Sequence, residues 1–194
     1  AIMVHVHVGL ANALMGVINY QSDNIPVLVF AGKTPITEFS EDGARMTPQQ
    51  SGQDVFDQNG ICRQFVKWDS ELRHPEQIVD LVDRMVHVSR QHPQGPTMLS
   101  LPREPLAGPV PSHRDTRLPI ARAQPITTAS LPESLTGALE RAKRPLIIIQ
   151  KTDPSGELAA AVDLLARRHG IAVIEPFALR NVCDSGAQYH LGYQ

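Results

Sequence analysis

A run of five apolar residues, from Val27 to Ala31, limits most strongly what this chain can fold into. Pro26 precedes the run and Gly32 ends it. A strand that is apolar at every position must be covered on both faces, which is typical of a parallel sheet between helices. Further short, mainly apolar runs lie at 97–101, 146–150 and 171–175. The sequence therefore predicts an α/β protein.

The start of the chain predicts a strand followed by a helix. β-Branched residues alternate over 2–8, which is the period of a half-buried strand, and Gly9 ends the alternation. Apolar residues then recur at helical spacing, at Leu10, Leu14 and Ile18. With the next strand near 26–31, this order predicts a strand–turn–helix–strand beginning.

Residues 32–60 carry little hydrophobic periodicity but many Gly, Thr, Gln and Asp residues. Connections of this length are usually functional or disordered, so this segment is where we look for chemistry. A helix is predicted after it, from Pro75 to the Gly95-Pro96 pair.

Proline divides the chain. The segment 103–130 holds five prolines and no apolar period, which predicts an extended linker. Residues 1–102 would then form the first domain. Residues 131–194 would begin a second, Rossmann-like α/β domain with strands at 146–150 and 171–175 and a helix that ends at Gly170.

Composition excludes several classes of function. A formal net charge of -2 gives no sign of nucleic-acid or membrane-surface binding. No apolar run approaches the ~20 residues that cross a bilayer, and the first residues lack a signal-peptide pattern, so a cytoplasmic location is expected. The two cysteines, Cys62 and Cys183, lie far apart and are expected to be reduced and buried.

Taken in order, six segments carry a resemblance to a known family: 9–13, 25–34, 53–68, 95–102, 170–176 and 190–193. Together they resemble thiamine-diphosphate-dependent enzymes of the acetolactate-synthase type. The resemblance covers essentially the whole chain. It matches the second half of the pyrimidine-binding domain, the interdomain linker and the first part of the central domain.

The resemblance implies a cofactor, a reaction and an assembly. Thiamine diphosphate with Mg²⁺ would act on a 2-oxo acid, and the full-length protein would be a homodimer or homotetramer. The family's catalytic glutamate is expected upstream of residue 1 and its metal-binding domain downstream of residue 194. No catalytic residue and no metal ligand is therefore expected in this segment, which is predicted to be inactive alone.

The resemblance also implies site residues. Gly9 and Asn12 would approach the pyrimidine ring of the cofactor, and Gln53 would contact the cofactor. Gln50 and Phe56 would face the substrate; relatives often carry a histidine near Gln50, and glutamine cannot shuttle a proton near neutral pH. The alternative is an ordinary strand-to-helix turn at Gly9 and a solvated loop that Phe56 anchors.

FAD is not part of the prediction, although acetolactate synthases bind it through glycine-rich turns. Residues 150–154 of this chain hold Gln, Lys, Thr, Asp and Pro in place of a glycine cluster. A second hypothesis for the whole chain is a non-catalytic α/β binding or assembly module that keeps the fold without the active-site carboxylate.

Overall fold

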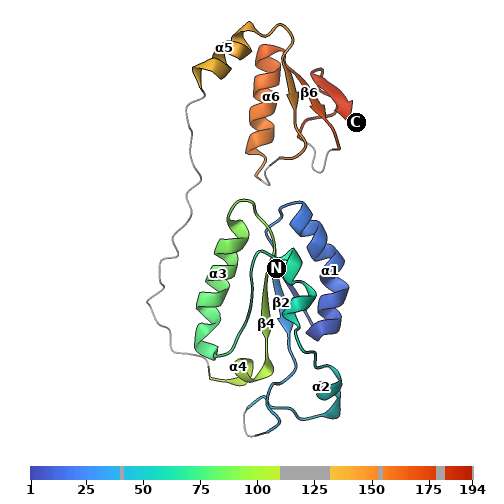
Figure 1. The fold of residues 1–194 in the computed structure, drawn as a ribbon, viewed down its shortest axis with the longest axis vertical. Coiled ribbons are helices and arrows are strands. Elements are labelled where there is room, and N and C mark those ends of the chain that lie inside the picture. Colours follow the sequence, from blue (N-terminus) through green and yellow to red (C-terminus); the bar gives the residue numbers. More distant parts are fainter. Residues whose placement is uncertain (40–41, 110–131, 153–154, 178–181, 194) are drawn as a thin grey trace. The chain divides into compact units, whose positions relative to one another are not determined.

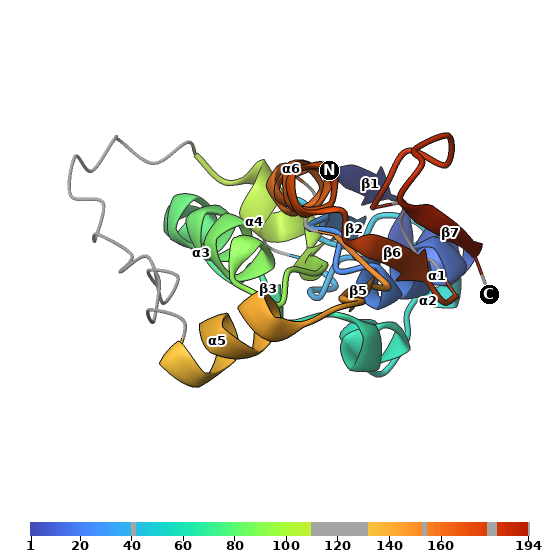
Figure 2. The same ribbon diagram turned by 90° about the horizontal axis from the view of Figure 1, so that it is seen from above.

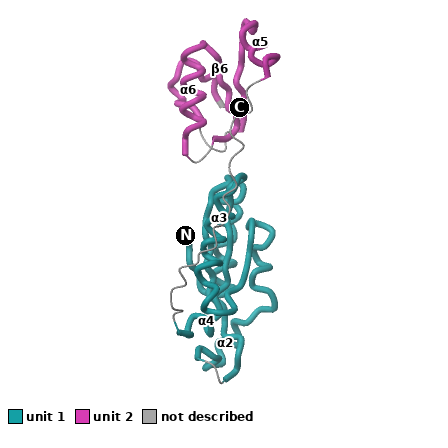
Figure 3. The backbone as a smooth tube through the Cα atoms, turned by 90° about the vertical axis from the view of Figure 1, so that its left-hand side faces the viewer, with its two compact units in different colours: residues 1–123 teal, residues 124–194 magenta. Residues whose placement is uncertain are grey.

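The computed structural model describes residues 1–39, 42–109, 132–152, 155–177 and 182–193 (Figure 1). The chain divides into two compact units, residues 1–123 and 124–194 (Figure 3). Each unit holds its own parallel sheet and its own buried cluster of apolar side chains. Among the described residues, no helix is long and apolar enough to span a membrane.

The first unit contains a four-stranded, fully parallel sheet in the order β1-β2-β4-β3. Its strands are β1 (Ile2–Val4), β2 (Leu28–Gly32), β3 (Asp69–Glu71) and β4 (Thr97–Leu101). The central strands β2 and β4 are those that the apolar runs predict. The edge strand β3 is polar and was not predicted, because its residues Asp-Ser-Glu carry no apolar signal.

Two helices cover opposite faces of this sheet, α1 (Val6–Ser22) and α3 (Ile78–Arg90) (Figure 2). Alternate side chains of the central strands pack into one of two apolar clusters. The cluster on the α1 side contains Leu10, Val17, Val29, Ala31, Cys62 and Met98. The cluster on the α3 side contains Leu72, Met85, Leu99 and Leu101. The double coverage explains why β2 is apolar from Leu28 to Ala31 and why every residue of β4 is buried.

The long segment after β2 is built from short helical pieces. These are α2 (Pro48–Gly52) and the 3₁₀ turns η1 (Asn59–Ile61) and η2 (Arg63–Phe65), with η3 (Pro75–Gln77) before α3. After β4 comes α4 (Arg103–Ala107). The first residues of the predicted linker are thus helical, and Pro105 is buried in the first unit. Most of the remaining linker lies outside the described residues, so the domain boundary stays a prediction.

The second unit contains a three-stranded parallel sheet in the order β5-β6-β7. Its elements are α5 (Glu133–Arg141), β5 (Leu146–Ile148), α6 (Glu157–His169), β6 (Ala172–Glu175) and β7 (His190–Tyr193). Val162 and Ala166 of α6 pack against Val173. Gly170 ends α6 with φ +62°, a left-handed conformation that favours glycine.

The structure confirms the α/β class and the parallel sheets, but the predicted strand 2–8 is too long. β1 ends at Val4, and Val6 turns the chain into α1 with φ +43°, a strained value for a β-branched residue. Alternation over residues 5–8 is too short to distinguish strand from helix, and burial of Val6, Leu10 and Val17 on one helix face decides the outcome.

Candidate functional site

The carboxyl end of the first sheet carries the connections that could hold a ligand. Three connections begin at this end: α1 starts after β1, the segment that contains α2 starts after β2, and α4 follows β4. α2 and α4 lie at this end of the sheet, whereas α1 runs back along one face (Figure 1). In open parallel sheets, ligands bind in the crevice outside the carboxyl ends of the strands. The strained Val6 lies at this end, as strained backbone often does near functional sites.

A buried polar network fixes the segment after α2 to this end of the sheet. The Gln58 Nε2 donates to the Gly32 carbonyl at 2.9 Å and to the Ser100 Oγ at 3.3 Å. The Ser100 hydroxyl donates to the Asn59 Oδ1 at 2.5 Å, and the Asn59 Nδ2 donates to the Asp69 Oδ2 at 2.9 Å. The network therefore ties β2, β4 and β3 to one loop.

Ion pairs lie beside this network. The Arg63 guanidinium lies 2.6 Å from the Asp57 Oδ2 and 3.3 Å from the Asp69 Oδ2. The hydrogen bond from Arg63, followed by one from the Gly60 amide, lowers the pKa of Asp57 below its ordinary value. Lys33, directly after β2, lies 2.5 Å from Glu71 at the end of β3.

Glu104 of α4 holds the first part of the same connection. One carboxylate oxygen accepts hydrogen bonds from the Ile36 amide at 2.7 Å and from the Thr37 amide and hydroxyl, both at 2.8 Å. Despite the cost of burial, the bonds from the Thr37 and Ile36 groups leave the pKa of Glu104 below its ordinary value. The segment after β2 is thus anchored at both of its ends.

The turn interpretation of Gly9 is wrong, because Gly9 lies in the first turn of α1. A Cβ atom at this position would lie 3.2 Å from the Cβ of Val4, so glycine lets α1 pack closely on β1. Asn12 lies farther along the same helix and is exposed. Both residues lie in the half of α1 that is nearer the carboxyl end of the sheet.

The three predicted residues of the long connection differ in their surroundings. The Gln50 Oε1 accepts hydrogen bonds from the Met46 amide at 2.7 Å and the Thr47 amide at 3.3 Å, which caps α2. Gln53 follows the last residue of α2 and is half-buried. The side chain of Phe56 is fully exposed. The capping of α2 occupies the Gln50 side chain, whereas the side chains of Gln53 and Phe56 take no part in this cap.

Two clefts flank Phe56. One, of about 390 Å³, is lined by Lys33, Ile36, Arg45, Asp54, Val55 and Phe56. The other, of about 640 Å³, extends from Phe56 past the buried network to β3 and α3. Neither cleft was predicted, because a segment rich in Gln, Asp and Gly looks uniformly solvated in the sequence. The buried Gln58 and Asn59 were missed for the same reason.

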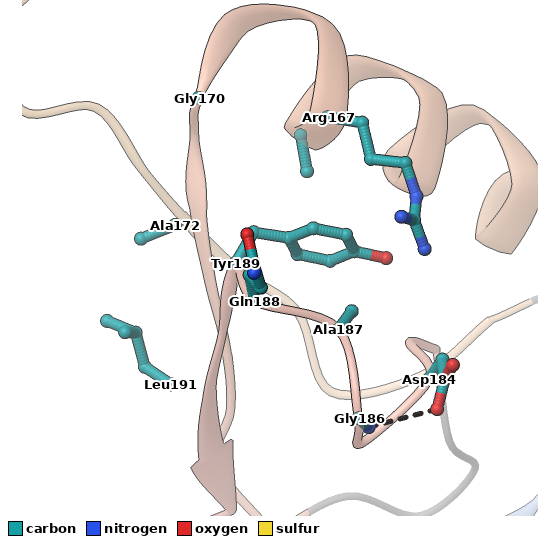
Figure 4. A pocket seen from close by; sticks show the side chains of 10 residues that line it. Arg167, Gly170, Ala172, Asp184, Gly186, Ala187, Gln188, Tyr189 and Leu191 are labelled. Carbon is teal, nitrogen blue, oxygen red and sulfur yellow. Dashed lines mark hydrogen bonds between the residues drawn. The ribbon is translucent and has the colours of Figure 1, made fainter.

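A third pocket, of about 770 Å³, lies in the second unit between α6 and the residues before β7 (Figure 4). The Arg167 guanidinium carbon lies 5.4 Å from the centroid of the Tyr189 ring. Asp163 accepts a hydrogen bond from the Tyr189 hydroxyl and pairs with Arg167 at 2.9 Å. Burial raises the pKa of Tyr189 to about 12. These polar groups bind one another and lie away from the carboxyl end of β6.

The end of β6 is tied to β7 by a buried acid. Glu175 is inaccessible to solvent; its Oε1 accepts a hydrogen bond from the Val182 amide at 2.7 Å, and its Oε2 lies 2.9 Å from the His190 Nε2. Sequence reasoning assigned Glu175 no role. Through these two contacts the Glu175 side chain links the end of β6 to Val182 and to the start of β7.

No family model matches the chain. Two curated relatives carry the name 2-succinyl-5-enolpyruvyl-6-hydroxy-3-cyclohexene-1-carboxylate synthase. The protein from Bacillus pumilus is 26% identical over 186 residues, covering 88% of this chain and 30% of the relative. The protein from Chlorobium phaeovibrioides is 28% identical over 179 residues, covering 80% and 29%.

Solved structures show the same relationship in the fold. A thiamine-diphosphate-dependent 4-hydroxybenzoylformate decarboxylase from Rhodococcus jostii RHA1 superposes with a TM-score of 0.72 at 21% identity, over 98% of this chain and 35% of that chain. The chain is thus similar in sequence to the two synthases and in fold to thiamine-diphosphate-dependent enzymes. An X-ray structure from Mycobacterium smegmatis, described as a thiamin-diphosphate-dependent enzyme, gives 0.67 at 21% identity over the same shares.

The chain spans about 30% of the length of these curated relatives. Gln53 has no hydrogen bond from its side-chain amide to another described residue, and that amide is free to pair with a polar ring. Within the described ranges, no group of three His, Cys, Asp or Glu side chains is arranged to hold a metal ion.

Proposed function

We propose that this chain is part of a thiamine-diphosphate-dependent enzyme that decarboxylates a 2-oxo acid or joins it to a second carbonyl compound, as acetolactate synthases do. One observation carries the proposal: Gly9, Gln53 and Phe56 all lie in segments that begin at the carboxyl end of one parallel sheet. The fold relationship supports it, since 4-hydroxybenzoylformate, named for the Rhodococcus relative, is itself a 2-oxo acid.

In this proposal the first unit forms one wall of the cofactor site. Bound thiamine diphosphate supplies a carbon centre that accepts the electron pair released by decarboxylation. Gly9 keeps the start of α1 close to β1, so that the helix leaves room for the cofactor ring. Gln53 offers both a donor and an acceptor to that ring, and Phe56 excludes water from the substrate.

Further groups are proposed to come from outside these 194 residues. These groups are the glutamate that assists proton transfer, the Mg²⁺ ligands, and a second subunit of a homodimer or homotetramer. FAD is left out of it. Without the glutamate, the chain alone is expected to turn over no 2-oxo acid, because general acid–base assistance contributes about 10²–10⁴-fold to such rates.

The test uses the complete gene product with thiamine diphosphate and Mg²⁺. Consumption of pyruvate or benzoylformate is expected, and Gln53→Ala should weaken binding of the cofactor about five- to tenfold, the loss of one hydrogen bond. Gln64→Ala is the matched control, since Gln64 is exposed on η2. A gene product that binds the cofactor but consumes neither acid would favour the non-catalytic module. Equal effects of the two variants would remove Gln53 from the site.

A further inference from the structure

The cleft of about 640 Å³ beside β3 is lined differently from the proposed cofactor side. Its wall includes Gln58, Arg63, Arg73, Gln77 and Leu81. Gly9, Asn12 and Gln53 are absent from this lining, whereas Phe56 borders both clefts of the first unit. The cleft therefore adjoins the proposed substrate side only through Lys33 and Phe56, and the proposed function assigns it no ligand.

The carboxylates that face this cleft are already paired. Glu71 lies 2.5 Å from the Lys33 Nζ. Asp57 and Asp69 lie 2.6 Å and 3.3 Å from the Arg63 guanidinium. These contacts satisfy both cations as well as the three anions, so none of these five groups is the obvious partner for a charged ligand.

Arg73 is the exception. It follows β3 by two residues, is exposed at the rim of the cleft, and has no hydrogen bond or ion pair with any other described residue. A guanidinium is always charged and presents a planar fork of donors that matches a carboxylate. The rim of the cleft therefore offers an unused site for one anionic group.

The inner wall of the cleft offers an unused acceptor. Gln58 is only 3% exposed, and its Nε2 donates to the Gly32 carbonyl and the Ser100 Oγ. Its Oε1 accepts no hydrogen bond from the described part of the chain and is not among the polar atoms sealed from solvent. Hydrogen bonds from the amide nitrogen to β2 and β4 fix the orientation of the Gln58 side chain. Its Oε1 can therefore accept a hydrogen bond from a ligand in the cleft that Gln58 lines.

We propose that this cleft binds a small carboxylic acid that also carries a hydroxyl or amino donor. Its carboxylate pairs with Arg73, and its donor binds the Gln58 Oε1. A 2-oxo acid lacks that donor, so the proposed substrate of the cofactor side is the weaker ligand here. Since Phe56 borders both clefts, an occupant of this one contacts the loop that leads from Gln53.

The experiment is an amide-resolved NMR titration of the 194-residue chain. The probes are lactate and 3-hydroxybutyrate, their deoxy counterparts propionate and butyrate, and alanine as an amino acid. At least one donor-bearing acid should shift the amides of Gln58 and Arg73, and it should bind about fivefold or more tightly than its deoxy counterpart, the value of one hydrogen bond. The titration contains no thiamine diphosphate, so its outcome is independent of the proposed function.

Two arginine variants test the carboxylate contact. Arg73→Ala should weaken binding of the best probe about tenfold or more, since a charge-assisted bond is lost. Arg84→Ala should leave binding unchanged, because Arg84 is an exposed residue of α3 that does not line the cleft. The proposal is overturned if no probe shifts Gln58, if deoxy acids bind as well as their hydroxylated counterparts, or if both variants behave alike.

Discussion

Asn59→Ala is expected to destabilise the first unit strongly. Asn59 is 8% exposed, and its side chain donates to the Asp69 carboxylate at 2.9 Å and the Ser70 carbonyl at 3.1 Å and accepts from the Ser100 hydroxyl at 2.5 Å. Truncation leaves a fully buried hydroxyl without its acceptor. With about 0.5–1.5 kcal/mol for each net hydrogen bond and about 1–3 kcal/mol for a buried unsatisfied group, the unfolding free energy should fall by about 2–4 kcal/mol.

Urea denaturation followed by tryptophan fluorescence measures this loss, because Trp68 is the only tryptophan and packs against the α3-side cluster. Asn19→Ala is the control, since Asn19 is exposed on α1, and should change the unfolding free energy by less than about 0.5 kcal/mol. If Asn59→Ala costs no more than the control, the network does not hold the loop to the sheet and the reasoning fails.

Three further results are expected. Gly9→Ala should lower the unfolding free energy by about 1 kcal/mol, because the added Cβ would lie 3.2 Å from the Cβ of Val4 in β1. Gly16→Ala should raise the unfolding free energy by about 0.5–1 kcal/mol through helix propensity, because a Cβ there would meet nothing within 4 Å. Thermal unfolding of the two variants measures the difference. Burial raises the pKa of Cys62 from 9.0 to about 11, so this thiol ionises at a lower pH in the unfolded chain than in the folded one. The unfolding free energy of the first unit, followed in urea by Trp68 fluorescence, should therefore fall by about 2–3 kcal/mol between pH 9 and pH 11, and Cys62→Ala should remove most of that fall. Glu104→Ala should speed hydrogen exchange of the Thr37 amide about tenfold or more, and an unchanged rate would contradict the anchoring role.

The central strands were predictable because a strand that is covered on both faces is mainly apolar. The structure places β2 at Leu28–Gly32 and β4 at Thr97–Leu101, close to the predicted 26–31 and 97–101. The edge strand β3 was not predictable in this way, because it is held by backbone pairing to β4 and its side chains are polar. Sequence periodicity detects burial, and it fails where hydrogen bonding alone forms the element.

The candidate site was only partly predictable. The resemblance directed attention to the segment that carries Gln53 and Phe56, which does lie at the carboxyl end of the sheet. The sequence did not indicate that Gln50 caps α2 or that Gln58 is buried against β2 and β4, because capping and burial of a glutamine depend on neighbours from distant segments. Polar residues of a loop look alike in sequence until tertiary contacts separate them.

The most direct test of the central claim is an NMR titration of the chain with thiamine diphosphate, read amide by amide. Binding is expected to be weak, because the chain supplies only one wall of the proposed site. The shifts should nevertheless cluster at Gly9, Gln53 and Phe56, at the carboxyl end of the first sheet, and Gln53→Ala should diminish them. Shifts confined to residues 133–177 of the second unit, or none with the cofactor in large excess, would contradict the account.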